Sequence, residues 1–300
     1  MLTFPIIKIS SFLNYYGLRW LCIVLIFITL PLGLSAQYQE AGAGVGGSLY
    51  YGDLSPDAVG SNLKLIRPSI GFFFNQHFNS RWGVKLSLNN MTLTGDDKNL
   101  TTATRSRNLS FRSNIWELAL CPEINLLKFD PYEGNSFTIY MSAGVALIHH
   151  NPKAYYAGNW YKLQPLRTEG QGLASDPNTR PYGLYQFTVP ITGGIKYSIK
   201  EDLNVFLEFG PRITFTDYLD DVSNKYANED ELRAAGGDIA VALSFRGNEI
   251  RTEPVGYPNL TQRGGAAVKD YYLNGLIGLS INFDNLFEGI FGPKVKCPKF

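Results

Sequence analysis

The sequence predicts an all-β protein, an eight-stranded antiparallel transmembrane β-barrel with long outer loops and short periplasmic turns. Three observations predict this fold: an export signal at the N-terminus, eight segments in which apolar and polar residues alternate, and connections that are alternately long and short. Composition agrees, since charged residues make up 18 % of the 300-residue chain, below the roughly 25 % of soluble domains. A net charge of +1 gives no basic footprint, so nucleic acid is not an expected partner.

The N-terminal segment has the pattern of a secretory signal peptide. Residues 20–33 are uncharged and apolar, Lys8 and Arg19 precede them, and the small residue Ala36 follows. A transmembrane anchor is the alternative, but the run is shorter than the ~20 residues that a spanning helix needs. We therefore divide the chain into a signal peptide (1–36), an outer-membrane barrel (37–286) and a periplasmic C-terminal tail (287–300).

Period-two alternation predicts eight strands. In the last of them the odd positions from Tyr271 to Phe283 are mostly large and apolar, whereas the even positions are mixed and include Asn, Ser and Gly. None of the outward positions carries a charge, as expected of a surface in lipid, where a charge at the midplane costs about 2–4 kcal/mol. The predicted strands are Glu40–Tyr51, Arg67–Phe78, Trp82–Thr92, Ser113–Leu127, Phe137–Ile148, Leu184–Ser198, Leu203–Thr216 and Asp270–Phe283.

Connection lengths support an even number of strands with both chain ends in the periplasm. Long connections at 52–66, 93–112, 149–183 and 217–269 alternate with shorter ones at 79–81, 128–136 and 199–202. Residues 238–246 also alternate, and 229–235 suit a short helix. We interpret both as structure within the last outer loop, with two extra strands as the alternative.

The inward faces hold the charges that the outward faces lack. An eight-stranded lumen is just wide enough for side chains to fill, so these ions have to pair with one another. A tight turn at 199–202 places Lys196 opposite Phe206 and diagonal to Glu208. Arg212 faces Glu117 or Glu123 only if the register of the closed ring permits it. We interpret the set as a structural polar network, with a narrow ion or proton channel as the alternative; its members are Glu40, Lys85, Glu117, Glu123, Lys196, Glu208 and Arg212.

Aromatic residues near strand ends predict membrane-interface anchors, because amphipathic rings settle at headgroup depth. These are Trp82, Trp116, Tyr51, Tyr197, Tyr218, Tyr271 and Tyr272.

Residues with catalytic or metal-binding chemistry are few. A lipid-modifying barrel enzyme is an alternative function, but no spacing links His149, His150 and Ser142 into a triad, and His77 stands alone near the periplasmic end. Asp217, Asp220 and Asp221 lack the spacing of a calcium loop and predict a solvated turn. We expect no catalytic residue, no cofactor and no metal.

Several stretches resemble one known family. They are 46–54 (GGSLYYGDL), 67–71 (RPSIG), 107–113 (RNLSFRS), 115–117 (IWE), 151–154 (NPKA), 168–172 (TEGQG) and 215–223 (FTDYLDDVS). In this order the chain resembles the PorG-like outer-membrane proteins of the type IX secretion and gliding motility machinery of Bacteroidetes-type bacteria.

The resemblance implies a non-enzymatic barrel, embedded in outer-membrane lipids, that associates with a periplasmic ring lipoprotein and its partner. Contact with that ring would use the short turns or the tail. We expect the loop motifs to fold over the barrel mouth, with Thr168, Glu169 and Gln171 pairing with Arg107, Arg112 or Arg167. The residues of interest in these motifs are Arg107, Asn108, Phe111, Arg112, Thr168, Glu169, Gln171, Asp217, Asp220 and Asp221.

Overall fold

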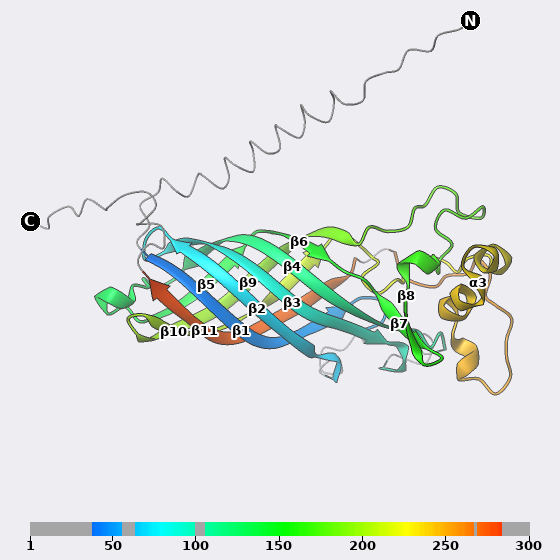
Figure 1. The fold of residues 1–300 in the computed structure, drawn as a ribbon, viewed down its shortest axis with the longest axis horizontal. Helices are drawn as coiled ribbons and strands as arrows, with labels where there is room; N and C mark the ends of the chain where they lie inside the picture. The colour runs from blue at the N-terminus through cyan, green and yellow to red at the C-terminus, as the bar shows by residue number, and fades with distance from the viewer. Residues whose placement is uncertain (1–37, 56–63, 100–105, 267–268, 284–300) are drawn as a thin grey trace, which may run out of the picture.

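Eight antiparallel strands form a closed ring in the computed structural model, which describes residues 38–55, 64–99, 106–266 and 269–283 (Figure 1). The predicted signal peptide and periplasmic tail lie outside these residues, as do the ends of the predicted barrel segment. The strands of the ring are β1 (Tyr38–Tyr51), β2 (Arg67–His77), β3 (Trp82–Asp96), β4 (Ser110–Asn125), β5 with β6 (Phe137–Ala143 and Val145–His149), β9 (Tyr185–Lys200), β10 (Leu203–Thr214) and β11 (Tyr271–Phe283).

Pairing of the first strand with the last closes the barrel. β1 pairs with β2 on one side and with β11 on the other, from Gln39↔Phe283 to Tyr51↔Tyr271. β5 and β6 act as one strand, since both pair with β4 in the same register and only Gly144 separates them. A side chain at Gly144 would collide with the Leu120 carbonyl oxygen, which explains glycine there. The predicted fold class is confirmed.

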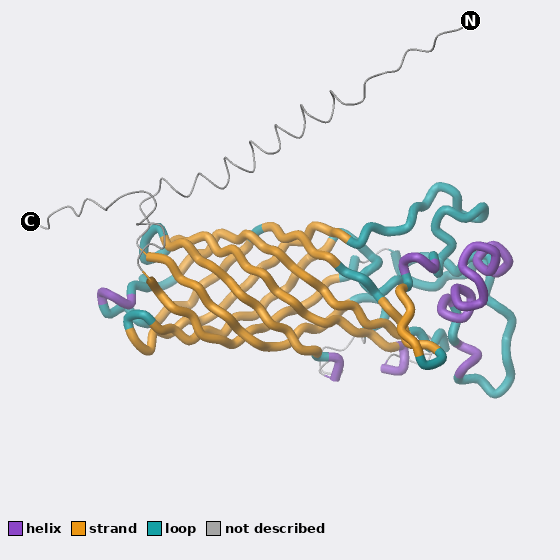
Figure 2. Tube along the Cα trace, viewed as in Figure 1, coloured by secondary structure: helices purple, strands orange, loops and turns teal. Residues whose placement is uncertain are grey.

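The long connections gather at one end of the barrel and the short turns at the other (Figure 2). The outer loops contain the hairpin β7–β8 (Lys153–Tyr156 and Asn159–Lys162), the helix α3 (Glu229–Ser244) and the 3₁₀ turns η3 (Asp97–Asn99), η5 (Gln164–Leu166) and η6 (Gly247–Glu249). A further 3₁₀ turn, η4 (Pro131–Glu133), lies in a periplasmic turn. Within the described ranges no helix is both long enough and apolar enough to cross a membrane.

One secondary-structure alternative is wrong. Residues 238–246 alternate in polarity, but most of them belong to α3, which is kinked at Gly237 (φ 71°), so no extra strand pair forms here. The helix begins at Asn228, whose side chain accepts a hydrogen bond from the Glu231 amide, and this cap decides the local structure. The predicted short helix at 229–235 forms its first half.

The outer face of the barrel is apolar around its middle. Val45, Phe72, Leu118, Phe209 and Ile277 all expose about half of their side-chain surface or more. Soluble proteins seldom expose apolar patches of this extent, whereas lipid-facing barrel strands have an apolar band. Hydrocarbon therefore covers this face.

The aromatic prediction is only partly correct. Trp82 and Tyr197 near the periplasmic ends, and Trp116 and Tyr271 near the outer ends, are exposed on the outer face. Tyr272 is wrong, because its even position turns it into the lumen, where its hydroxyl donates to the Glu117 carboxylate at 2.6 Å. Tyr51 is buried and stacks on the Tyr271 ring, and Tyr218 stacks on Tyr182 within the outer loops.

An arginine placed in the middle of the lipid-facing belt should destabilise the barrel in proportion to its depth. Ile277→Arg should lower the free energy of unfolding in lipid vesicles by about 2–4 kcal/mol. Phe137→Arg, at the periplasmic start of β5, is the control and should cost about 0–1 kcal/mol. Urea titration of both variants measures the difference, and equal costs at the two depths would contradict a bilayer around these strands.

Candidate functional site: the lumen network and the outer cap

All seven charged residues predicted for the lumen point inward and are buried. Glu40 comes from β1, Lys85 from β3, Glu117 and Glu123 from β4, Lys196 from β9, and Glu208 and Arg212 from β10. Each lies at an inward position of its strand, which is why alternation alone locates them. They form two groups, one toward the periplasmic end and one toward the outer end.

The group nearer the periplasm is a chain of ion pairs. Lys196 Nζ lies 2.6 Å from Glu40 Oε2 and 3.5 Å from Glu123 Oε1. Lys85 Nζ lies 2.7 Å from Glu208 Oε2 and 3.3 Å from Glu123 Oε2. Glu123 therefore bridges the two lysines, and the network spans the lumen from β1 to β10.

Neutral donors add hydrogen bonds to these carboxylates. Ser280 donates to Glu40 at 2.5 Å, Asn75 to Glu123 at 2.8 Å, and Tyr140 to Glu208 at 2.8 Å. The Tyr140 ring also contacts both lysines, with Lys85 Nζ 5.0 Å and Lys196 Nζ 5.1 Å from its centroid. Buried ion pairs are stable only when their remaining hydrogen-bonding capacity is used in this way.

Toward the outer end a second, smaller group centres on Glu117. Arg212 Nε lies 3.6 Å from Glu117 Oε1, and Asn89 donates to the same oxygen at 2.9 Å. Arg212 also donates to the Gly210 carbonyl oxygen at 2.8 Å, so its guanidinium is fixed by backbone as well as by charge. The lumen is thus filled by side chains over both halves of the strands.

The predicted pairing of Lys196 is only half right. The register places Lys196 opposite Phe206, as expected, but Lys85 takes Glu208, and Lys196 reaches across the lumen to Glu40 and Glu123. The register between neighbouring strands is set by the turn that joins them, whereas contacts across the barrel depend on how the whole ring closes.

His77 is not alone, contrary to the prediction. Its Nε2 lies 2.9 Å from Glu40 Oε2, and its ring stacks on Tyr38 at 4.4 Å. His77 occupies an inward position of β2 beside β1. Alternation could therefore have placed it in the network, where it is a fourth basic side chain beside four carboxylates.

The outer loops form a buried cap whose centre is Arg263. Its guanidinium lies 3.1 Å from Glu169 Oε1 and donates to the Asp221 carbonyl oxygen at 2.5 Å. Asp221 also accepts hydrogen bonds from Thr168 and Tyr182. Glu169 in turn accepts the Ser223 backbone N–H at 2.8 Å. Two stretches that carry the family resemblance, 168–172 and 215–223, are therefore held together by this arginine and by direct hydrogen bonds between them.

The stretch 107–113 joins the cap from the side. Arg107 forms an ion pair with Asp97 at 2.7 Å and donates to the backbone oxygens of Arg263 and Asp53. Asn108, in the left-handed region at φ 56°, donates to Glu249 at 3.1 Å. The Phe111 ring packs edge-on against Tyr50 at 4.8 Å.

The expected partners within the cap are wrong. Thr168 and Glu169 contact Asp221 and Arg263 rather than Arg107, Arg112 or Arg167. Gln171 is buried, but neither atom of its amide group has a partner within the described part of the chain. Arg112 points to the outer surface of the barrel. Arg263 was missed because it lies in the longest loop, where spacing gives no register and no pattern marks it.

The aspartates of the stretch 215–223 are buried, so the predicted solvated turn is also wrong. Asp217 accepts the Ser223 hydroxyl at 2.7 Å, and burial raises the pKa of both Asp217 and Asp221 to about 6. Asp220 and Asp270 share the Tyr50 hydroxyl, at 2.7 and 2.9 Å, and burial raises both pKa values well above the usual range. Repulsion adds to this effect, from Asp270 at Asp220 and from Asp217 and Asp53 at Asp270. In the ranges that the structure describes, no cluster of His, Cys, Asp and Glu has the arrangement of a metal site.

The residues considered for lipid-modifying chemistry do not meet. Ser142 lies beside Glu123 in the register of β5, whereas His149 lies beside Trp116, nearer the outer end. His150 is buried, its Nε2 bonds to the Gly183 carbonyl oxygen at 3.1 Å, and burial lowers its pKa to about 4. A nucleophile and its base have to be within hydrogen-bond reach, and these are not.

Comparison with known proteins gives a family. The sequence profile described as "Domain of unknown function (DUF6089)" matches residues 19–239. The chain belongs to this DUF6089 family. No curated protein matches it.

Solved structures similar to this DUF6089 barrel are outer-membrane proteins. They include Ail of Yersinia pestis in complex with the heparin analogue sucrose octasulfate (8 % identity, 82 % of this chain and 98 % of that one, TM-score 0.39). They also include OprG of Pseudomonas aeruginosa (12 %, 83 % and 97 %, TM-score 0.39) and Neisserial surface protein A (6 %, 82 % and 96 %, TM-score 0.39). At these identities the likeness concerns the fold alone.

Removing one lysine from the lumen of the DUF6089 barrel should be strongly destabilising. Lys196→Met leaves Glu40 without its ion-pair lysine and Glu123 with only Lys85, and breaking such a buried pair costs about 3–5 kcal/mol. Lys200→Met, at the exposed end of the same strand, is the control and should change stability by less than about 0.5 kcal/mol. Equal unfolding midpoints in urea for both variants would contradict the network.

The cap should be more stable in mild acid than in base. Asp217 and Asp221 have a pKa near 3.8 when unfolded and about 6 when folded, so the folded cap binds more protons between these values. Their stabilising contribution is complete below about pH 4 and is lost as the pH rises through 6. Hydrogen exchange of the Leu219 and Val222 amides, corrected for its intrinsic rate, should therefore speed up from pH 5 to pH 8. Asp217→Asn should weaken this dependence, and a cap that tightens with rising pH would refute the assignment.

Proposed function

We propose that this chain is a non-enzymatic integral barrel of the outer membrane that serves as a structural or accessory subunit of the type IX protein secretion machinery. The closed architecture is the observation that carries the proposal. Ion pairs and rings fill the lumen, and loops packed around Arg263 cover the outer mouth. A barrel closed in this way offers surfaces to partners rather than a path to solutes.

The resemblance to PorG-like proteins supports the secretion role. Stretches that carry it, among them 107–113, 168–172 and 215–223, meet in the outer cap. These stretches form one buried polar network, and a network of this kind fixes a single geometry. A fixed geometry suits a structural subunit.

Contact with a periplasmic ring lipoprotein and its partner would involve the periplasmic turns. The turn that contains η4 is the largest of these in the described ranges and exposes Leu126, Leu127 and Lys128 at its start. Apolar and charged side chains side by side at the end of a membrane barrel suit a protein interface. We place the docking surface at residues 126–136.

Deletion with complementation and site-specific cross-linking test the proposal. Cells that lack this chain should retain the machine's cargo proteins in the periplasm, and the full-length chain should restore secretion. A photo-cross-linker at Glu133 should capture a periplasmic ring component, whereas the same group at Asn159, at the tip of the outer hairpin β7–β8, should not. Normal secretion in the deletion strain would overturn the proposal.

A further inference from the structure

A row of basic side chains crosses three neighbouring strands on the outer surface of the barrel. Arg112 on β4 lies directly opposite Lys153 on β7, and Lys153 lies directly opposite Lys162 on β8. Residues paired in this way share one face of the sheet. The three side chains therefore form a continuous cationic line at the outer end of the strands.

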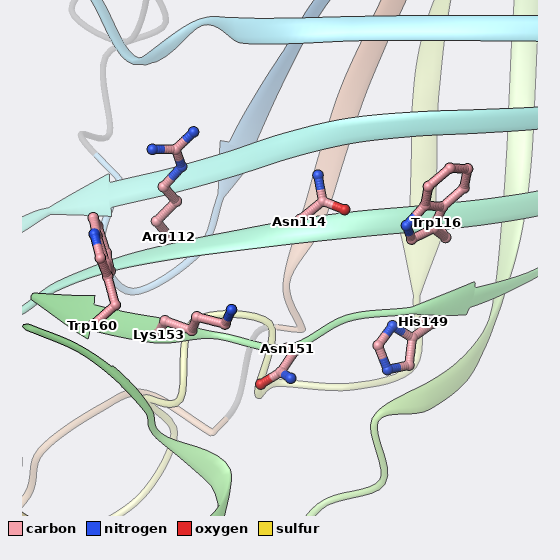
Figure 3. A pocket seen from close by; sticks show the side chains of 7 residues that line it. All are labelled: Arg112, Asn114, Trp116, His149, Asn151, Lys153 and Trp160. Carbon is pink, nitrogen blue, oxygen red and sulfur yellow. The ribbon is translucent and has the colours of Figure 1, made fainter.

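Two of these bases, Arg112 and Lys153, line a pocket of about 430 Å³ on the lipid-facing side (Figure 3). Figure 3 shows Arg112, Asn114 and Trp116 along β4, with Lys153, Asn151 and His149 on the neighbouring segment. Trp160 of β8 stands at the outer edge of the pocket and Trp116 at its lower edge, and each is about half exposed. Two aromatic side chains thus flank a basic and amide-lined floor.

No acid among the described residues neutralises these bases. In the part of the chain that the structure describes, none of Arg112, Lys153 and Lys162 forms an ion pair or a side-chain hydrogen bond. The acid next in register, Asp96 on β3, accepts the Lys98 amide and contacts none of them. Like charges directly opposite in a sheet are destabilising, so a bound anion would remove a real cost.

The surface on the periplasmic side of the pocket is apolar and suits acyl chains. From Trp116 the outward face of β4 continues into Leu118 and Leu120, and that of β6 into Leu147 and Val145, all of them exposed. Cations therefore lie one step above the hydrocarbon band, at the depth where the headgroups of the outer leaflet lie. A ligand that matches both surfaces has an anionic head and hydrocarbon tails.

We infer that this pocket binds the phosphorylated headgroup of an outer-leaflet glycolipid, a lipopolysaccharide. Arg112 and Lys153 hold the phosphate, Asn114 and Asn151 donate hydrogen bonds to the sugar, and the acyl chains lie against Leu118 and Leu147. Arginine suits a phosphate because its fork of N–H groups binds two oxygens at once. The inference rests on the outer-membrane placement of the proposed function and is independent of the secretion role.

Binding to the full-length protein in detergent micelles tests the site. The probes are lipopolysaccharide and the same preparation after enzymatic removal of its phosphates. Arg112→Gln/Lys153→Gln should weaken binding of the intact form about ten-fold, since two charge-assisted contacts are lost. Arg81→Gln/Lys200→Gln, which removes one exposed arginine and one exposed lysine at the periplasmic end, is the matched control and should bind as the unmodified protein does.

Three results would overturn the inference: equal binding of the dephosphorylated form, an equal loss in the control variant, or displacement by inorganic phosphate at the concentration of the lipid. The changed residues are surface residues outside the lumen network, and heat-modifiable mobility on gels checks that both variants fold. Arg112→Lys keeps the charge but loses the bidentate fork, so it should weaken binding less than Arg112→Gln does, which separates loss of charge from loss of structure. A secretion defect has no bearing on these outcomes.

Discussion

Carboxylates enclosed in a lumen that only side chains can fill require cations at contact distance, and the rest of this structure depends on that constraint. The free energy of removing an ion from water is recovered only through close charges and complete hydrogen bonding. Glu123 lies between Lys85 and Lys196 and so has close charges on both sides, with Tyr140 packed against both lysines. Strands far apart in sequence are therefore fixed relative to one another, and the ring is held from within as well as by its backbone ladders.

The outer cap also contains buried carboxylates, and different residues stabilise them. Arg263 is buried among Glu169, Asp221 and backbone oxygens, so the stretches 168–172 and 215–223 meet at a single guanidinium. Around Tyr50 the described residues bring no cation to Asp220 and Asp270; both carboxyl groups contact the Tyr50 hydroxyl instead, and burial raises their pKa values. With lumen and mouth both filled, the surfaces left for interaction are the periplasmic turns and the lipid-facing rim, where Arg112 and Lys153 remain unneutralised.

Local periodicity explains why much of this could be predicted. Each inward charge was found because side chains alternate along a strand, and the closed ring followed from strand number and connection lengths. Partners across the lumen were harder, since Lys196 meets Glu40 only once the ring has closed in one register. Arg263 and the β7–β8 hairpin could not be predicted at all, because long loops carry no repeat that ties a residue to its neighbours. The prediction for Tyr272 was wrong for a simpler reason. It relied on the residue lying near a strand end and neglected its even position, which faces the lumen.

The central claim is that ion pairs and rings fill the lumen, so the barrel carries no current. Planar-bilayer recording of the purified full-length chain tests it most directly. The account predicts a baseline without discrete conductance steps across ±100 mV, in both neutral and mildly acidic buffer. Reproducible steps whose size changes in a Glu123→Gln variant would show a continuous path through these residues and contradict the account.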